Sequence, residues 1–187
     1  FNVTGALSIG AGKSLTLSTS STISGNLTVD GTLNIGTTTL TLNGAGKTIS
    51  GSTGAASITG SGTIDVTTGD KTIASGTNLS IAPVFTITGT RTVTNNGTIT
   101  LTGDLSGTLA GSTWTNAANS TLNAAGAVLA TGTLNASAGG NTVNYNSNIA
   151  QSVKTPSSTY CNLTISNAGT KTFGTAGTIT VTNLVTV

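Results

Sequence analysis

The sequence of 187 residues contains no histidine, no methionine and no glutamate, and its only acids are four aspartates. It has a single cysteine, two prolines, and an aromatic content of 3%. Without histidine, a serine or cysteine nucleophile has no ordinary base. Charged residues make up 5% of the chain, whereas about a quarter of an ordinary globular domain is charged. The composition therefore argues against an enzyme before any motif is considered.

The four aspartates do not favour an enzyme either. Glycoside hydrolysis needs a pair of carboxylates at a defined separation. Asp65 stands between Ile64 and Val66, so it is predicted to face outward if those two residues face the core. Asp70 lies in a Gly-Asp-Lys turn. We predict no catalytic residues, no cofactor and no metal site, because Thr68-Gly69-Asp70 is not a calcium loop and the nonapeptide calcium repeat is absent.

Charge and hydropathy exclude two further classes of partner. The formal net charge of +2 is small and scattered, which does not favour nucleic acid binding. No run of about 18 apolar residues is present, so no membrane insertion is predicted. One cysteine cannot form an internal disulfide. The chain opens on Phe1 rather than on methionine, and its surface chemistry is that of Thr, Ser, Asn and Gly. We expect an extracellular or cell-surface protein after removal of a signal peptide, or a piece of a longer chain.

What the sequence has in abundance is threonine, with 43 residues, and serine, with 21. These residues alternate with apolar ones in short runs of period two, the pattern of β-strands. The apolar pairs are Leu7/Ile9, Leu15/Leu17, Leu27/Val29, Leu33/Ile35, Leu40/Leu42, Ile64/Val66, Leu79/Ile81, Ile99/Leu101, Leu163/Ile165 and Ile179/Val181. Helix is not expected, even in the alanine-rich stretch 116–136, which Gly126 interrupts.

Two phrases recur along the chain and indicate a repeat architecture. The first phrase reads GTLNI at 31, GTIDV at 62, GTITL at 97, GTLNA at 132 and GTITV at 177. The second is a cation followed by Ser or Thr and usually by an apolar residue, starting at Lys13, Lys47, Lys71, Arg91 and Lys171, with Lys154 as the departure. Degenerate self-similarity with short strands is typical of a solenoid.

We therefore predict one all-β domain over 1–187, a parallel β-helix (β-solenoid) whose coils stack about 4.8 Å apart. Coils of roughly 20 residues give about nine of them. An antiparallel sandwich is the alternative. The predicted core, with the intervening threonines exposed, comprises Leu33, Ile35, Leu40, Leu42, Ile64, Val66, Ile99, Leu101, Leu163, Ile165, Ile179 and Val181. Cys161 shares the parity of Leu163, so it is expected to be buried.

The C-terminal segment 141–181 carries a resemblance to a known group of proteins. Its pieces are Val143-Asn144-Tyr145-Asn146, Ala150-Gln151, Tyr160-x-Asn162-Leu163-Thr164 and Gly169-Thr170-Lys171-Thr172. These resemble the Thr/Asn/Gly-rich repeats of large secreted bacterial surface proteins, the filamentous haemagglutinin-like adhesins among them. The resemblance implies an extracellular β-helical stalk or filament and carries no catalytic residues. The secretion module that usually precedes such repeats is not visible.

Threonine arrays favour a second function. Segments such as Thr98-Ile99-Thr100-Leu101-Thr102 place threonine on one strand face, which resembles the Thr-x-Thr ladders of ice-binding β-solenoids. Against this function, the strand spacing wanders between six and nine residues, which we expect to spoil a flat lattice. Ice binding is therefore the alternative.

The first prediction of function is a structural protein that assembles end to end into a filament or forms the stalk of an adhesin. Both ends of the sequence read as uncharged strands with no polar cap, and solenoids without caps expose an open core. The main predicted partner is a second copy, joined head to tail, and host or surface glycans are further candidates. The predicted assembly residues are Phe1, Val3, Ile179, Val181, Val185 and Val187.

Asparagine followed one residue later by Ser or Thr, the pattern of a glycosylation acceptor, occurs seven times. With 18 asparagines and a third of the chain Ser or Thr, chance alone gives about six. The sequence therefore does not establish a glycosylated protein. The positions are Asn2, Asn26, Asn78, Asn96, Asn119, Asn135 and Asn162.

Overall fold

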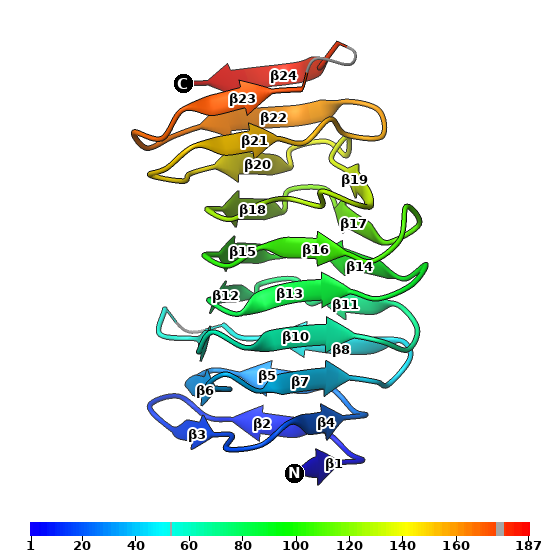
Figure 1. Ribbon diagram of the computed structural model, residues 1–187, viewed down its shortest axis with the longest axis vertical. Helices are drawn as coiled ribbons and strands as arrows, with labels where there is room; N and C mark the ends of the chain where they lie inside the picture. The colour runs from blue at the N-terminus through cyan, green and yellow to red at the C-terminus, as the bar shows by residue number, and fades with distance from the viewer. Residues whose placement is uncertain (53, 175–177) are drawn as a thin grey trace.

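The computed structural model describes residues 1–52, 54–174 and 178–187, and within them the chain forms β-strands and no helix. The strands stack into a parallel β-solenoid of about nine coils (Figure 1). The coils contribute strands to three large sheets, of six, seven and nine strands, which we call faces A, B and C. The predicted fold class and coil number are confirmed. Of the repeated phrase at 177, Gly177 lies outside the described residues.

The strands of the three faces follow one another in the order A, B, C along the chain. Face A contains β1 (Asn2–Val3), β4 (Ser21–Ile23), β7 (Thr39–Leu42), β10 (Thr63–Val66), β13 (Val84–Ile87) and β16 (Leu105–Gly107). Face B contains β2 (Leu7–Ile9), β5 (Leu27–Val29), β8 (Lys47–Ser50), β11 (Lys71–Ile73), β14 (Thr92–Asn95), β17 (Thr113–Asn116) and β19 (Thr133–Asn135). Face C contains β3 (Ser14–Thr16), β6 (Thr32–Asn34), β9 (Ser57–Thr59), β12 (Asn78–Ile81), β15 (Thr98–Leu101), β18 (Thr121–Ala124), β20 (Thr142–Tyr145), β22 (Tyr160–Ile165) and β24 (Val181–Thr186).

A separate pair of strands, β21 (Gln151–Val153) and β23 (Lys171–Phe173), follows face A toward the C-terminal end. Between β16 and β21, no strand of the described residues continues face A, and the connection after β18 takes this place (Figure 1). It forms an isolated bridge between Val128 and Leu105, and both Val128 and Leu129 are buried.

All strand pairs are parallel, and their register absorbs coils of unequal length. Ser14 pairs with Thr32, a step of 18 residues, and Thr32 pairs with Ser57, a step of 25 residues. The additional residues lie in the corners between faces, because the strands themselves stay aligned. Parallel pairing between coils satisfies the main-chain hydrogen bonds of each strand from both sides.

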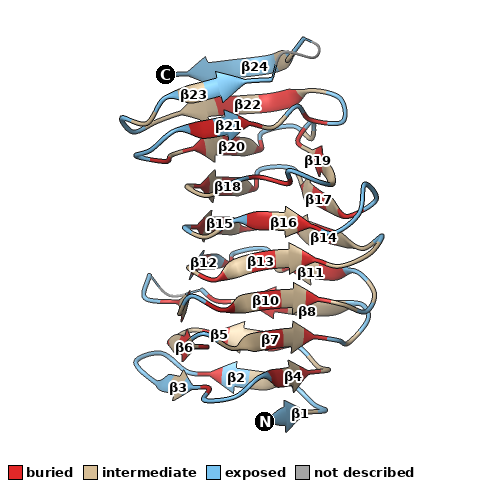
Figure 2. Ribbon diagram, in the orientation of Figure 1, coloured by how far each residue is buried: buried red, intermediate tan, exposed pale blue. Residues whose placement is uncertain are grey.

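Alternation of buried and half-buried residues along most strands of the middle coils confirms the predicted register there (Figure 2). Leu40, with no exposed surface, and Leu42, 3% exposed, flank Thr41, which is half-buried. Such threonines were predicted to be exposed. They point outward but are half-buried, because neighbouring coils cover the sides of each outward residue. Of the twelve predicted core residues, nine are buried.

The prediction was wrong for three of the core residues. Ile165, Ile179 and Val181 pack against the core but are only partly buried. They lie in the last coils that the structure describes. Three inward residues of the first coil, Val3, Leu7 and Leu15, are likewise partly buried, whereas Ile9 and Leu17 are buried. An inward side chain in a solenoid is covered by coils on both sides, so an end coil leaves half of that cover missing.

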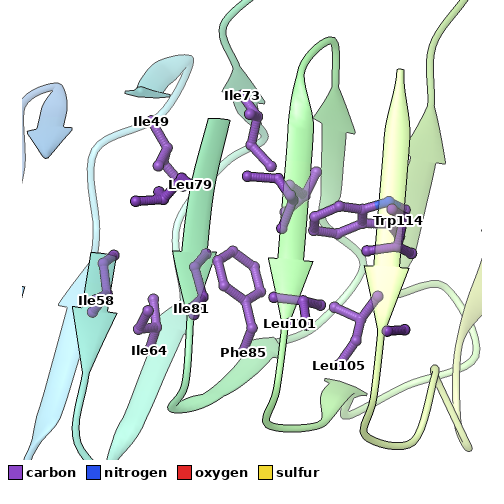
Figure 3. Close-up of a cluster of buried hydrophobic side chains, with 14 of the residues drawn as sticks. Ile49, Ile58, Ile64, Ile73, Leu79, Ile81, Phe85, Leu101, Leu105 and Trp114 are labelled. Atoms are coloured by element: carbon purple, nitrogen blue, oxygen red, sulfur yellow. The ribbon is translucent and has the colours of Figure 1, made fainter. Parts of the chain in front are cut away.

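The core is filled by aliphatic side chains in stacked rows, with aromatic rings inserted in its second half (Figure 3). Phe85 and Trp114 pack edge to face, with ring centroids 5.9 Å apart and planes at 89°. Such a pair stabilises beyond the apolar area that it buries. The single tryptophan has no exposed surface.

Inward-facing asparagines at the corner between faces B and C were not predicted. Asn95 and Asn116 close β14 and β17, share the parity of Val93 and Trp114, and are at most 1% exposed. Asn95 Nδ2 donates to Asn116 Oδ1 at 3.1 Å, and Trp114 Nε1 donates to the same oxygen at 2.9 Å. This asparagine ladder satisfies polar groups of the corner that would otherwise be buried without partners.

A buried pair of tyrosines lies near the C-terminal end of the core. Tyr145 and Tyr160 have no exposed surface, their rings meet edge to face with centroids 6.5 Å apart, and their hydroxyl oxygens are 2.9 Å apart. The Tyr160 hydroxyl donates to the Lys154 carbonyl oxygen. Burial raises the pKa of Tyr145 to about 12 and raises the pKa of Tyr160 as well.

The tyrosine pair predicts a specific response to alkali. Both pKa values lie above the unfolded value of about 10, so the neutral pair stabilises the fold fully below pH 10. This stability is lost as the pH rises from about 10 through the folded pKa of about 12. In a near-ultraviolet titration, we expect no tyrosinate absorbance around pH 10, and its later appearance together with loss of the β-sheet circular dichroism. The chain in urea, as the control, should titrate near pH 10; a folded chain doing the same would contradict the burial.

Cys161 follows Tyr160 and is also buried, at 6% exposed, as predicted. Two consecutive residues are buried because β22 runs around a corner: Tyr160 bridges Ala136 after face B, whereas Asn162 pairs with Thr142 on face C. Cys161 Sγ accepts a hydrogen bond from the Gly140 N–H at 3.2 Å. The position of Cys161 in the alternation with Leu163 predicted its burial correctly. Cys161 packs at the corner, however, and is not part of the main core cluster.

Candidate functional site

Each of the four aspartates accepts a hydrogen bond from the following coil. Asp65 faces outward, as predicted, and Asp70 follows a bend and directly precedes β11 in the same coil. These carboxylates join neighbouring coils. The contacts are Asp30 Oδ1 with the Ser52 N–H at 2.9 Å, Asp65 Oδ1 with Thr88 Oγ1 at 2.6 Å, Asp70 Oδ1 with the Thr92 N–H at 2.8 Å, and Asp104 Oδ1 with the Ala127 N–H at 2.7 Å.

Three of the lysines of the repeated cation phrases bind main-chain carbonyl oxygens at the corners. Lys171 Nζ donates to Ser147 O, Ser166 O and Gly169 O, at 2.9, 3.2 and 2.7 Å. Lys71 is 2% exposed, and burial lowers its pKa, an effect that Asp70 partly offsets. Lys154 Nζ donates to Leu129 O at 2.6 Å, and burial lowers its pKa. These three lysines therefore supply hydrogen bonds to carbonyl oxygens that lack strand partners at the corners.

No group of three or more potential metal ligands of the His, Cys, Asp or Glu type comes together in the part of the chain that the structure describes. Nor do these residues include a helix that could cross a membrane.

The outward threonines, serines and asparagines form ranks that run along the solenoid. On face B, Thr92, Thr113 and Thr133 form one rank, and Thr94, Thr115 and Asn135 form a second. These strands stay in register despite their unequal spacing in the sequence, because corners of variable length absorb the difference. The longest rank, on face C, joins Ser14, Thr32, Ser57, Ser80, Thr100, Asn123, Asn144, Thr164 and Thr186.

Within these ranks, many side chains bind one another across coils. Asn123 Nδ2 donates to Thr100 Oγ1 at 3.3 Å, and Asn144 Nδ2 donates to Asn123 Oδ1 at 3.2 Å. On face B, Asn135 Nδ2 donates to Thr115 Oγ1 at 3.2 Å. The ranks thus act as side-chain ladders that hold neighbouring coils together.

The predicted assembly residues divide into two groups. Phe1, Val185 and Val187 are exposed, at 56, 54 and 96%. Val3, Ile179 and Val181 are partly buried against their own core, so they hold the end coils in place. Val185 pairs with the inward Leu163 and therefore faces the open end of the core, whereas Leu184 pairs with the outward Asn162.

Surface hollows lie at two places along the rod. Two neighbouring hollows, each of about 340 Å³, lie between the connection after β18 and the segment around β21; Ala127 and Ser152 line both of them, and Val128 and Val153 line the first. The other, of about 430 Å³, lies at the corner between faces B and C, and its lining is polar. Three of the seven glycosylation-type asparagines, Asn78, Asn96 and Asn119, border this hollow.

No protein-family model, curated protein or solved structure matches the chain. Its function has to be argued from the geometry.

Proposed function

We propose that this protein is an extracellular structural rod, used as the stalk of a surface adhesin or joined end to end with copies of itself. The observation that supports this role most directly is the state of the end coils. Val3, Leu7 and Leu15 at one end, and Ile179 and Val181 at the other, are partly covered inward residues of a continuous core. Such a core is suited to continuation by a further coil.

The distribution of polar groups supports a mechanical role. Its aspartates, three of its lysines and many outward asparagines are engaged between coils or at corners, as described above. A chain with this arrangement resists bending and offers few groups for chemistry. The Thr/Asn/Gly-rich repeats of secreted bacterial adhesins, which the segment 141–181 resembles, suit the same role.

The edge of β24 is where the next coil would lie. Leu184, Val185 and Val187 are more than half exposed there, on or beside an unpaired strand edge. Exposed strand edges of this kind pair with other strands. The coil that covers them belongs either to further residues of the same protein or to a second copy. A head-to-tail contact between copies is heterologous, so it does not close and propagates as a filament.

Val185→Lys tests the joint between copies. We expect the wild-type chain to form oligomers that lengthen with concentration, and the variant to stay folded and monomeric, because a lysine would face the apolar core of the next copy. Leu109→Lys is the matched control, since Leu109 is 51% exposed and belongs to a middle coil. Size-exclusion chromatography with light scattering gives the measurement. Equal oligomerisation of wild type and Val185→Lys would contradict a joint at this end.

Ice binding is the second candidate function, and the two aligned threonine ranks on face B favour it. The mutual hydrogen bonds within the ranks count against it, because side chains that bind one another are less free to order water. We expect no inhibition of ice recrystallisation. Clear inhibition, abolished by Thr113→Tyr and Thr115→Tyr but kept in the control Thr41→Tyr on face A, would reverse this ranking.

A further inference from the structure

The polar hollow at the corner between faces B and C is formed by three successive coils. The connections from β11 to β12, β14 to β15 and β17 to β18 supply Ser75 and Thr77, Asn96, and Asn119, respectively. The first residues of β12 and β15, Asn78 and Thr98, complete the polar wall. These six residues present three hydroxyl groups and three carboxamides. The remaining wall is glycine and alanine. We call this site the polar hollow.

Thr77 is a wall residue of the polar hollow whose hydroxyl has no hydrogen-bond partner within the described residues. It is 4% exposed, and its Oγ1 is buried without a hydrogen-bond partner. At the equivalent corner between β17 and β18, Ser120 Oγ donates to the carbonyl oxygen three residues earlier, Ala117 O, at 2.8 Å. A buried hydroxyl without a partner costs about 1–3 kcal/mol. Such a cost is offset when a ligand or a water molecule supplies the missing hydrogen bond.

The other groups of the polar hollow are held in place by the fold. Asn96 Nδ2 and its main-chain N–H both donate to Ile73 O, at 3.1 Å each. Asn119 adopts a left-handed backbone conformation, with φ of 61°, and its N–H donates to Gly139 O at 3.1 Å. Ordered carboxamides lose little entropy when they bind a ligand, so the site is preorganised.

The lining determines the class of ligand. No wall residue is charged or aromatic, so neither an ion nor a flat apolar molecule is matched. Small-molecule sites span about 300–1,000 Å³, and this volume lies within that range, although such sites are usually apolar. Carboxamides and hydroxyls both donate and accept hydrogen bonds. A neutral ligand with several hydroxyl groups meets these conditions.

We propose that the polar hollow binds a neutral carbohydrate, with Thr77, Asn96 and Asn119 as its hydrogen-bonding groups. This inference rests on the proposed adhesin role, for which it supplies a glycan contact on the side of the rod. Without an aromatic platform, binding of a single sugar is weak, in the millimolar range. Repetition along joined copies increases the overall affinity through multivalency.

The test is a titration of the ¹⁵N-labelled chain with methyl glucoside, methyl galactoside and methyl mannoside, followed by NMR. We expect saturable shifts of the amides of Gly76, Gly97 and Asn119 with at least one sugar. Binding should weaken about tenfold or more in Thr77→Val and in Asn119→Gly, since each removes a hydrogen-bonding group. Asn119→Gly keeps the left-handed backbone, and Asn167→Gly, at another corner with φ of 64°, is the matched control that should bind like wild type.

Thr77→Val should also be no less stable than wild type, because it removes an unpartnered hydroxyl. If Thr77→Val does not fold, the loss of sugar binding in Asn119→Gly alone tests the proposal. Absence of saturable shifts at the polar hollow with all three sugars would overturn the proposal, as would shifts that neither variant alters. The proposed structural role is tested separately, by measuring the length of the particles. If the particles are rods but no sugar binds in the polar hollow, this inference is refuted and the proposed function stands.

Discussion

Leu40→Asp is expected to unfold the solenoid, whereas Thr39→Asp, one residue earlier on the same strand, is expected to leave it folded. Leu40 has no exposed surface and stacks in register between Ser21 and Ile64. A carboxylate there is buried without a partner, which costs about 3–5 kcal/mol. This cost is comparable to the whole stability of many domains, about 5–15 kcal/mol.

The control variant Thr39→Asp introduces the same charge on the same strand, but at an outward position. Thr39 points outward beside Thr63, so an aspartate in its place remains hydrated and should change the free energy of unfolding by less than about 1 kcal/mol. Urea unfolding followed by circular dichroism measures both variants. Equal destabilisation of the two would mean that the assigned inward and outward faces of β7 are wrong.

Asn116→Leu should cause the second-largest loss of stability, although it makes the core more apolar. The change removes the acceptor shared by Trp114 Nε1 and Asn95 Nδ2, and it removes the donor to Thr142 O at 3.1 Å. Each buried group left without a partner costs about 1–3 kcal/mol, so we expect a loss of about 3 kcal/mol or more.

Asn123→Leu is the control for Asn116→Leu. Asn123 lies on the following strand of the same coil but points outward, where its Nδ2 donates to Thr100 Oγ1. We expect a loss below about 1 kcal/mol. Urea unfolding monitored by the fluorescence of Trp114 compares both variants, since this is the single tryptophan. A stability of Asn116→Leu equal to or above that of wild type would contradict the asparagine ladder.

Period-two alternation predicted the strands and most of the core, because a strand that is buried on one face must repeat every second residue. Leu33, Ile64 and Ile99 illustrate the success, each with no exposed surface. Asn95 and Asn116 illustrate the failure. They share the parity of Val93 and Trp114, yet sequence reasoning assumed that only apolar residues point inward. Period-two alternation, applied without that assumption, would have predicted that both asparagines point inward.

The ranks and the polar hollow could not be predicted, because both depend on which residues of different coils are neighbours. The step between paired residues ranges from 18, for Ser14 and Thr32, to 25, for Thr32 and Ser57. A sequence without known corner lengths does not fix these steps. Sequence reasoning therefore saw the spacing as irregular and missed that Thr77 and Asn119, two coils apart, border the same hollow.

Cryo-electron microscopy of the wild-type chain at increasing concentration tests most directly that this molecule is built to be continued coil upon coil. If it is, particles should be rods that grow along one axis from a unit of about 45 Å, with an axial repeat of about 4.8 Å running unbroken through each joint. Compact particles without this axial repeat would contradict the account, whereas rods that keep one length at every concentration would contradict only the joint between copies.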